Sequence, residues 1–108
     1  LIGGVKMYKI LLCCTSGITT SRLVESIKKE GVSRGAKVLC WAVAESAVDL
    51  SWADADCVLV APQAKGDLEK VKSMINGAIP CAAIDENAFS NMDGKATLDQ
   101  AISLIDKN

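Results

Sequence analysis

The sequence predicts an α/β protein built on a single open four-stranded parallel sheet flanked by helices. Short apolar segments suited to strands that are buried on both faces occur at residues 8–13, 37–43, 57–61 and 80–84. Longer segments with apolar residues at helical spacing separate several of them. Because strands that alternate with helices form parallel units with right-handed crossovers, we expect the strands to share one sheet.

The first strand and the first helix enclose a turn of small residues. Residues 8–13 form the expected strand, and residues 20–34 form the expected helix, with apolar side chains along one face. Between them, Cys14 is followed by hydroxyl residues and by Gly17, which can adopt a positive φ. The sequence therefore places a thiol at a strand-to-helix turn.

The second and third strands are separated by a segment of mixed character. Residues 37–43 are rich in β-prone side chains. Residues 44–52 combine acidic, hydroxyl and small apolar residues, and we expect a loop or one short helix there. The third strand, residues 57–61, ends at Pro62.

The C-terminal part contains two further helices and the last strand. Residues 66–76 have a helical pattern, and Gly77 is expected to cap this helix. A short strand follows at residues 80–84, then a loop-like segment at residues 85–94. Residues 95–106 form the expected closing helix, with apolar residues facing inward.

The length suits one domain, since 108 residues can enclose a hydrophobic core without disulfide or metal support. Residues 1–6 show no periodic pattern, and Met7 is a plausible natural start. We therefore expect residues 1–6 to be an expression remnant or a flexible N-terminus, and residues 7–108 to be the folded domain.

The composition excludes several classes of function. A net charge of −1 without a basic tail argues against a nucleic-acid binder. Neither a membrane span nor a secretory leader is visible, so a cytoplasmic protein is expected. Five cysteines without a C-x-x-C pair argue against a disulfide framework and against a thioredoxin-type site. The absence of histidine removes His-based catalysis and most zinc sites, and we expect no metal and no cofactor.

The turn after the first strand has the features of an anion site. Ligands of parallel sheets bind beyond the carboxyl ends of the strands, where the Cys14 turn and the Ala61-Pro62-Gln63 turn are expected to meet. The start of a helix attracts anions and stabilises a thiolate. Cys14 is therefore a candidate nucleophile, although the pattern alone fits a buried structural role equally well. Cys13 belongs to the apolar strand and is expected in the core.

Three segments resemble the lactose/cellobiose-type enzyme IIB proteins of the bacterial phosphotransferase sugar-uptake system. They are C-x-x-G-x-x-T-S starting at Cys14, A-D-x-V-L-x-A-P-Q ending at Gln63, and I-D-x-x-x-F-x-x-M-D-G ending at Gly94. The resemblance extends over residues 7–107. The cysteine segment is moderately specific by itself, whereas the three segments in this order are specific for the family.

The resemblance implies a phosphocysteine carrier. Cys14 corresponds to the phosphorylated cysteine, and the phosphate-holding loop corresponds to Thr15, Ser16, Gly17, Ile18, Thr19, Thr20 and Ser21. Pro62 and Gln63 are candidates for supporting that loop. The implied partners are a phosphohistidine-bearing IIA protein as donor and a membrane-embedded IIC permease that binds the sugar. The sugar would be a β-linked disaccharide such as cellobiose, chitobiose or lactose, and a carrier that visits two partners is expected to be a monomer.

Two other classes of protein fit the sequence less well. Low-molecular-weight tyrosine phosphatases and arsenate reductases also carry a cysteine in a phosphate loop, but they need an arginine six residues later, where this chain has Thr20. Receiver-like signalling domains need acidic residues at the strand ends, where this chain has Cys13, Val43 and Ala61. Arg22 is expected to be solvent-exposed, and Asp85 and Asp93 are expected to shape loops.

Overall fold

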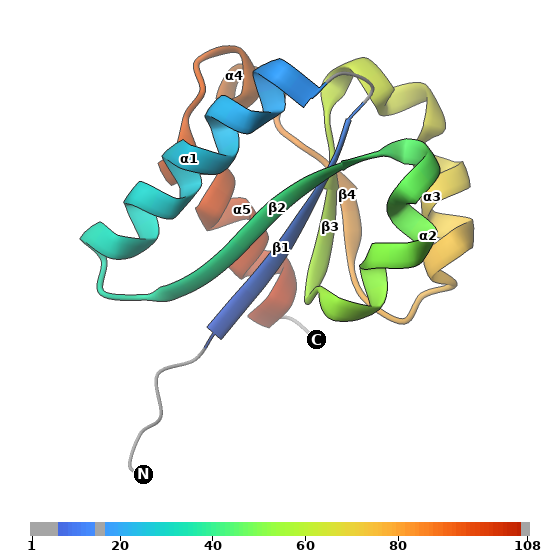
Figure 1. Ribbon diagram of the computed structural model, residues 1–108, viewed down its shortest axis with the longest axis horizontal. Coiled ribbons are helices and arrows are strands. Elements are labelled where there is room, and N and C mark those ends of the chain that lie inside the picture. The colour runs from blue at the N-terminus through green and yellow to red at the C-terminus, as the bar shows by residue number, and fades with distance from the viewer. Residues whose placement is uncertain (1–6, 15–16, 107–108) are drawn as a thin grey trace, which may run out of the picture.

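The computed structural model describes residues 7–14 and 17–106, apart from the side chains of residues 17–20, 45 and 63–65. Within these residues the sheet has the strand order β2-β1-β3-β4, and every neighbouring pair is parallel (Figure 1). The strands are β1 (Met7–Cys14), β2 (Lys37–Ala44), β3 (Cys57–Val60) and β4 (Cys81–Ala83). The predicted α/β fold with a single parallel sheet is therefore confirmed.

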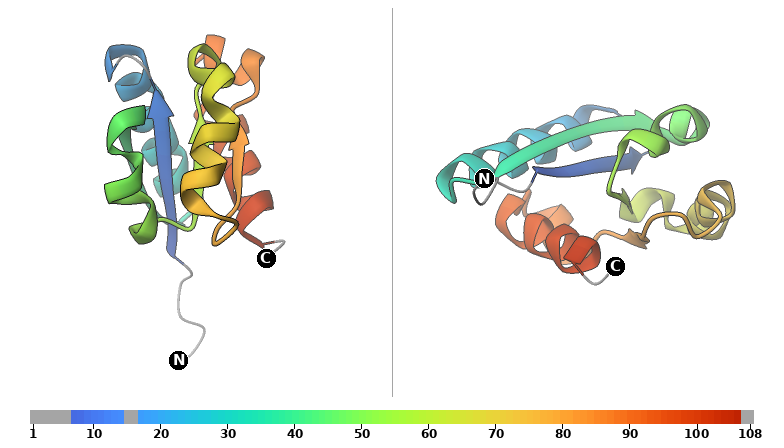
Figure 2. Two further views of the ribbon diagram at one scale, coloured as in Figure 1. Left: turned by 90° about the vertical axis from the view of Figure 1, so that its right-hand side faces the viewer. Right: turned by 90° about the horizontal axis from the view of Figure 1, so that it is seen from below.

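Helices cover both faces of the sheet, as the views in Figures 1 and 2 show. One face is covered by α1 (Gly17–Ser33) and α5 (Gly94–Asp106), with the short α4 (Glu86–Ser90) beside them. The other face is covered by α2 (Val48–Ser51) and α3 (Leu68–Ile75). Short 3₁₀ turns adjoin these elements at Glu45–Ala47, Trp52–Asp54 and Pro62–Asp67.

Strand β1 lies at the centre of two core clusters because its side chains alternate between the faces of the sheet. Ile10 and Leu12 belong to the cluster under α1 and α5, whereas Leu11 and Cys13 belong to the cluster under α2 and α3. The covering helices complete the clusters with buried residues, among them Leu23, Ile27 and Leu98 on the first side and Val71 and Ile75 on the second. Both faces of β1 are thus buried, which explains its continuous apolar sequence.

Several element boundaries differ from the sequence predictions. Helix α1 begins at Gly17, three residues before the predicted start, because glycine and threonine are tolerated in a first helical turn. The helix predicted over residues 66–76 is present but shorter, since residues 66 and 67 end the 3₁₀ turn Pro62–Asp67 and α3 covers Leu68–Ile75. Residues 1–6 lie outside the described residues.

The segment at residues 85–94, predicted as a loop, contains helix α4. The side chain of Asp85 caps this helix, since its Oδ2 accepts a hydrogen bond of 3.0 Å from the backbone N–H of Ala88. At residues 44–52, the short-helix alternative is confirmed by α2. The last strand is shorter than predicted, but Pro80 and Ile84 still hydrogen-bond to β3 through their backbones.

Candidate functional site

Cys14 is the last residue of β1 and lies at the carboxyl edge of a central strand. On one side it is paired with Ala44 of β2, and its Sγ donates a hydrogen bond of 3.8 Å to the carbonyl oxygen of Val43. On the other side, the backbone N–H of Ala61 donates to the carbonyl oxygen of Cys13 at 2.8 Å. Only 4% of the Cys14 surface is exposed. The thiol is therefore held at the edge of the sheet between the ends of β2 and β3.

This edge is also the point where the chain changes direction across the sheet. From β1 the chain passes through α1 to β2 on one side, and then crosses to β3 on the other side of β1. In open parallel sheets such a switch point leaves a crevice beyond the carboxyl ends of the strands, and ligands bind there. Cys14 occupies this position.

The start of α1 adds an electrostatic preference to the same edge. Only two residues separate Cys14 from Gly17, the first residue of α1. The first N–H groups of a helix have no partner within it, and the helix dipole adds partial positive charge. No acidic residue lies in the first turn of α1 to neutralise that charge. The surroundings of Cys14 therefore favour an anion.

The segment predicted to hold phosphate is partly within the described residues. Thr15 and Ser16 lie outside them. Gly17, Ile18, Thr19 and Thr20, described by their backbones, form the start of α1 together with Ser21, whose side chain is exposed. This part of the predicted loop is thus the first turn of a helix. The unpaired backbone N–H groups of that turn lie at the end of α1 that follows Cys14. Binding of phosphate by residues 15–21 stays a prediction.

The second predicted arm of the site begins at the neighbouring strand end. Pro62 and Gln63 open the 3₁₀ turn that follows β3, and the N–H···O bond from Ala61 to Cys13 fixes the start of this turn beside β1. Figure 1 shows this turn and the start of α1 at the same end of the sheet. Pro62 is half-buried. The structure does not describe the Gln63 side chain, so a role for its amide stays a prediction.

The other cysteines of the described residues are placed differently from Cys14. Burial raises the pKa of the Cys40 and Cys57 thiols to about 12, and burial raises the pKa of Cys81 to about 11. Cys13 is completely buried on the opposite face of β1. Because burial disfavours the thiolate form, we expect the thiols of Cys40, Cys57 and Cys81 to be poor nucleophiles.

The remaining polar candidates have the roles that the sequence suggested. Asp85 caps α4, and Asp93 caps α5 by accepting a hydrogen bond of 3.0 Å from the backbone N–H of Ala96. Arg22 is exposed on α1. Both aspartates thus shape the chain by capping helices.

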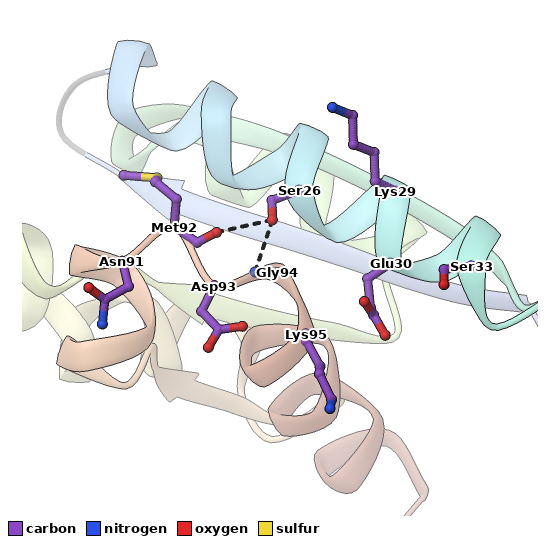
Figure 3. Close-up of a pocket in the computed structure, with 9 residues that line it drawn as sticks. All are labelled: Ser26, Lys29, Glu30, Ser33, Asn91, Met92, Asp93, Gly94 and Lys95. Carbon is purple, nitrogen blue, oxygen red and sulfur yellow. Dashed lines mark hydrogen bonds between the residues drawn. The ribbon is translucent and has the colours of Figure 1, made fainter.

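Sequence reasoning missed Ser26, which joins two distant segments (Figure 3). Its hydroxyl donates to the carbonyl oxygen of Met92 and accepts from the N–H of Gly94, both at 3.0 Å. Met92 has a φ of 51°, a left-handed conformation that is uncommon for a residue with a side chain. The M-D-G motif was the only sign in the sequence that residues 92–94 have a special role, and it gave no indication that they bind Ser26 on α1.

A cleft of about 520 Å³ lies between α1 and the connection from α4 to α5 (Figure 3). Its walls are formed by Ser26, Lys29, Glu30 and Ser33 of α1 and by residues 91–95. A second hollow, of about 400 Å³, follows the same helix toward its start and is lined by Ser21, Arg22, Glu25, Ser26 and Lys29. Ser26 and Lys29 belong to both, so the two hollows adjoin along α1.

The residues that the structure describes include no cluster of three or more His, Cys, Asp or Glu side chains that could hold a metal ion. Among the same residues, no helix is both long and apolar enough to cross a membrane.

Comparison with known proteins gives consistent relationships over nearly the whole chain. The family model for the "PTS system, Lactose/Cellobiose specific IIB subunit" matches residues 9–100. The oligo-beta-mannoside-specific EIIB component of the PTS from Bacillus subtilis (strain 168) is 38% identical over 102 residues, which cover 92% of this chain and 97% of that protein.

Two solved structures share the fold. The cellobiose-specific phosphotransferase IIB component from Borrelia burgdorferi has a TM-score of 0.81 at 28% identity, covering 96% of each chain. The lactose-specific IIB component domain from Streptococcus pneumoniae also has a TM-score of 0.81, at 18% identity, covering 92% of this chain and 98% of that one. At the lower identity the likeness concerns the fold alone.

Proposed function

Because the chain belongs to the lactose/cellobiose-specific IIB subunits of the sugar phosphotransferase system, a family of phosphotransferases, we propose that it is a phosphocysteine carrier with Cys14 as the acceptor. The observation that carries this proposal is the position of Cys14 at the carboxyl end of β1, separated by two residues from a helix whose first turn has no acidic residue. A dianionic phosphoryl group on Sγ would adjoin the positive end of α1.

The proposed first step is an in-line transfer from a phosphohistidine of the IIA partner. The Cys14 thiolate attacks phosphorus, so that the S–P bond forms while the P–N bond breaks, and the leaving imidazole takes up the proton that the thiol gave up. The Sγ–H bond to Val43 needs the thiol proton, so this contact is lost when the thiolate forms. Backbone N–H groups at the start of α1 stabilise the charge on the transferring group.

The proposed second step delivers the phosphoryl group to a sugar held by the IIC permease. A sugar hydroxyl attacks phosphorus, the S–P bond breaks, and the hydroxyl proton returns to the thiolate. The absence of histidine in this chain agrees with a donor histidine on the partner. The carrier would then work at the cytoplasmic face of the permease, as a monomer that meets its two partners in turn.

The proposed sugar is a β-linked disaccharide or oligosaccharide. Cellobiose, chitobiose and lactose fit this class, and the relative named for oligo-β-mannosides extends it to β-mannosides. Selection among these sugars would lie mainly in the permease, since the Cys14 edge of this chain handles only the phosphoryl group.

Intact-mass measurement after incubation with a phosphorylated IIA protein tests the proposal. We expect the wild-type protein to gain one acid-sensitive phosphoryl group and the Cys14→Ser variant to gain none, while circular dichroism shows both folded. Cys13→Ser is the matched control, since Cys13 is fully buried on the other face.

We expect Cys13→Ser to accept the phosphoryl group as wild type does, while the buried hydroxyl lowers the free energy of unfolding by about 1–3 kcal/mol. Equal loss of acceptance in both folded variants would contradict the assignment of Cys14. Hydrolysis of a phosphotyrosine mimic without stable phosphorylation would instead indicate a cysteine phosphatase.

A further inference from the structure

One face of α1 links the Cys14 edge to the cleft beside α5. Arg22, Ser26, Lys29 and Ser33 recur at intervals of three or four residues and therefore lie along one side of the helix. These four residues line the two adjoining hollows. Only two residues separate Cys14 from the first residue of α1, so this face begins close to the proposed acceptor.

The carboxylates along this face are already engaged within the chain. Glu25 pairs with Lys28 at 3.6 Å, and Glu30 pairs with the Arg34 guanidinium at 2.7 Å. Asp93 accepts the hydrogen bond from the N–H of Ala96 at the start of α5. The charges of Glu25 and Glu30 are thus partly balanced by cations of this chain, whereas Asp93 keeps its negative charge.

The basic residues of the same surface have no ion-pair partner within the part of the chain that the structure describes. Arg22, Lys29 and Lys95 are exposed, and none of them forms an ion pair with another residue of the described part of the chain. In Figure 3, Lys29 extends from the outer side of α1, and Lys95 extends from the start of α5 away from α1, so the two side chains stand at the two rims of the cleft. We call these three residues the basic strip. Arg22 and Lys29 are two helical turns apart, about 10 Å along the axis.

We propose that the basic strip docks an acidic surface of the phosphoryl-donor protein. This inference rests on the proposed function. The whole chain has a net charge of −1, so any attraction for an anionic partner comes from this local surface and not from the overall charge. A phosphorylated donor adds the negative charge of its phosphoryl group to whatever acidic side chains surround it.

The same strip accounts for release of the spent donor. Before transfer, the phosphoryl charge belongs to the donor and is attracted by the strip. After transfer, the charge belongs to Cys14, at the start of the helix that carries Arg22 and Lys29. The donor has lost negative charge and the strip has gained an anionic neighbour, so their attraction weakens.

Charge reversal tests this proposal with a matched control. The test variant is Arg22→Glu/Lys29→Glu, and the control is Lys37→Glu/Lys72→Glu, which changes the net charge equally. Lys37 starts β2 at the opposite end of the sheet, and Lys72 lies on α3 on the opposite face. Each protein is mixed with a phosphorylated IIA donor, and the second-order rate constant of phosphorylation is followed by intact mass.

At low salt, we expect the strip variant to react about tenfold or more slowly than the control. The difference between the two rate constants should disappear at about 1 M salt, where the Debye length is about 3 Å. Both variants should reach the same final extent of phosphorylation. Equal rate constants for the two variants at low salt would overturn the docking proposal while leaving the carrier function intact. Failure of the wild-type protein to accept any phosphoryl group would overturn the proposed function instead.

Discussion

Cys13 and Cys14 are adjacent and have the same side chain, but their surroundings give them different chemistry. Alternation along β1 sends Cys13 into the cluster under α2 and α3, whereas Cys14 faces the side of α1 and α5. Only Cys14 ends the strand beside a helix start. The thiol proposed to react is therefore selected by its place in the strand rather than by its type.

The buried thiols of Cys40 and Cys57 should make stability depend on pH in the alkaline range. Their pKa values are raised from 9.0 to about 12 by burial. The folded state therefore keeps these protons where the unfolded state loses them, so the stability that they contribute is complete below pH 9 and falls as the pH rises toward 12. We expect each thiol to contribute a loss of about 1.4 kcal/mol per pH unit within this window.

Urea unfolding at a series of pH values measures this dependence, with Cys40→Ala/Cys57→Ala as the comparison. The double variant should be less stable at neutral pH, because two buried side chains are shortened. Its stability should nevertheless fall less steeply than that of the wild type above pH 9. Parallel curves for the two proteins would show that these thiols do not couple to folding.

The helices α1 and α5 approach closely where Gly94 meets Ser26. A Cβ atom added at Gly94 would clash with backbone and side-chain atoms of Ser26. The helices cannot separate without breaking two hydrogen bonds of the Ser26 hydroxyl, which donates to the Met92 carbonyl oxygen and accepts from the Gly94 N–H. Glycine is therefore required here by packing and not by backbone conformation.

We expect Gly94→Ala to lower the free energy of unfolding by about 1–3 kcal/mol, because the added methyl group overpacks this contact. Gly66→Ala is the matched control, since an added Cβ there would meet no atom within 4 Å. Its effect should be within about 0.5 kcal/mol. Urea unfolding midpoints measure both, and a Gly94→Ala protein as stable as the control would contradict the close approach.

The outer edge of β4 is closed by a side chain of α5. The Gln100 amide donates to the carbonyl oxygen of Ala83 at 2.7 Å and accepts from the N–H of Asp85 at 3.2 Å. These are the backbone groups that another strand would otherwise bind. Gln100 thus anchors α5 to the edge strand.

Replacement of Gln100 by methionine keeps the length of the side chain and removes both hydrogen bonds. We expect Gln100→Met to cost about 1–3 kcal/mol of stability, and hydrogen exchange at the Asp85 amide to accelerate. Ser103→Met introduces the same side chain at an exposed position of α5 and should leave that amide unchanged. Unaltered exchange in Gln100→Met would show that Gln100 does not protect the edge.

The fold of the whole molecule could be predicted from those strands and helices whose own sequences show a clear apolar pattern. The buried strands are continuous apolar runs, and the position of Cys14 at a strand end follows from where the first run stops. Helix α4 was missed because five residues are too few to show a helical period. The contact of Ser26 with Gly94 joins residues 68 positions apart, and no local pattern records such a pair.

Because the sheet is shared by both core clusters, the chain should unfold as one cooperative unit. Leu98 and Ile75 are fully or almost fully buried, one in each cluster, so Leu98→Ala and Ile75→Ala should each lower the free energy of unfolding by about 2–5 kcal/mol.

Two spectroscopic signals can follow the two faces of the sheet. Trp41 and Trp52 pack against the cluster of Ile75, so their fluorescence reports unfolding of that face, whereas far-ultraviolet circular dichroism reports the helices on both faces. The two signals should give one midpoint in each variant. A fluorescence midpoint that stays at the wild-type value in Leu98→Ala while the dichroism midpoint falls would show that the faces unfold separately.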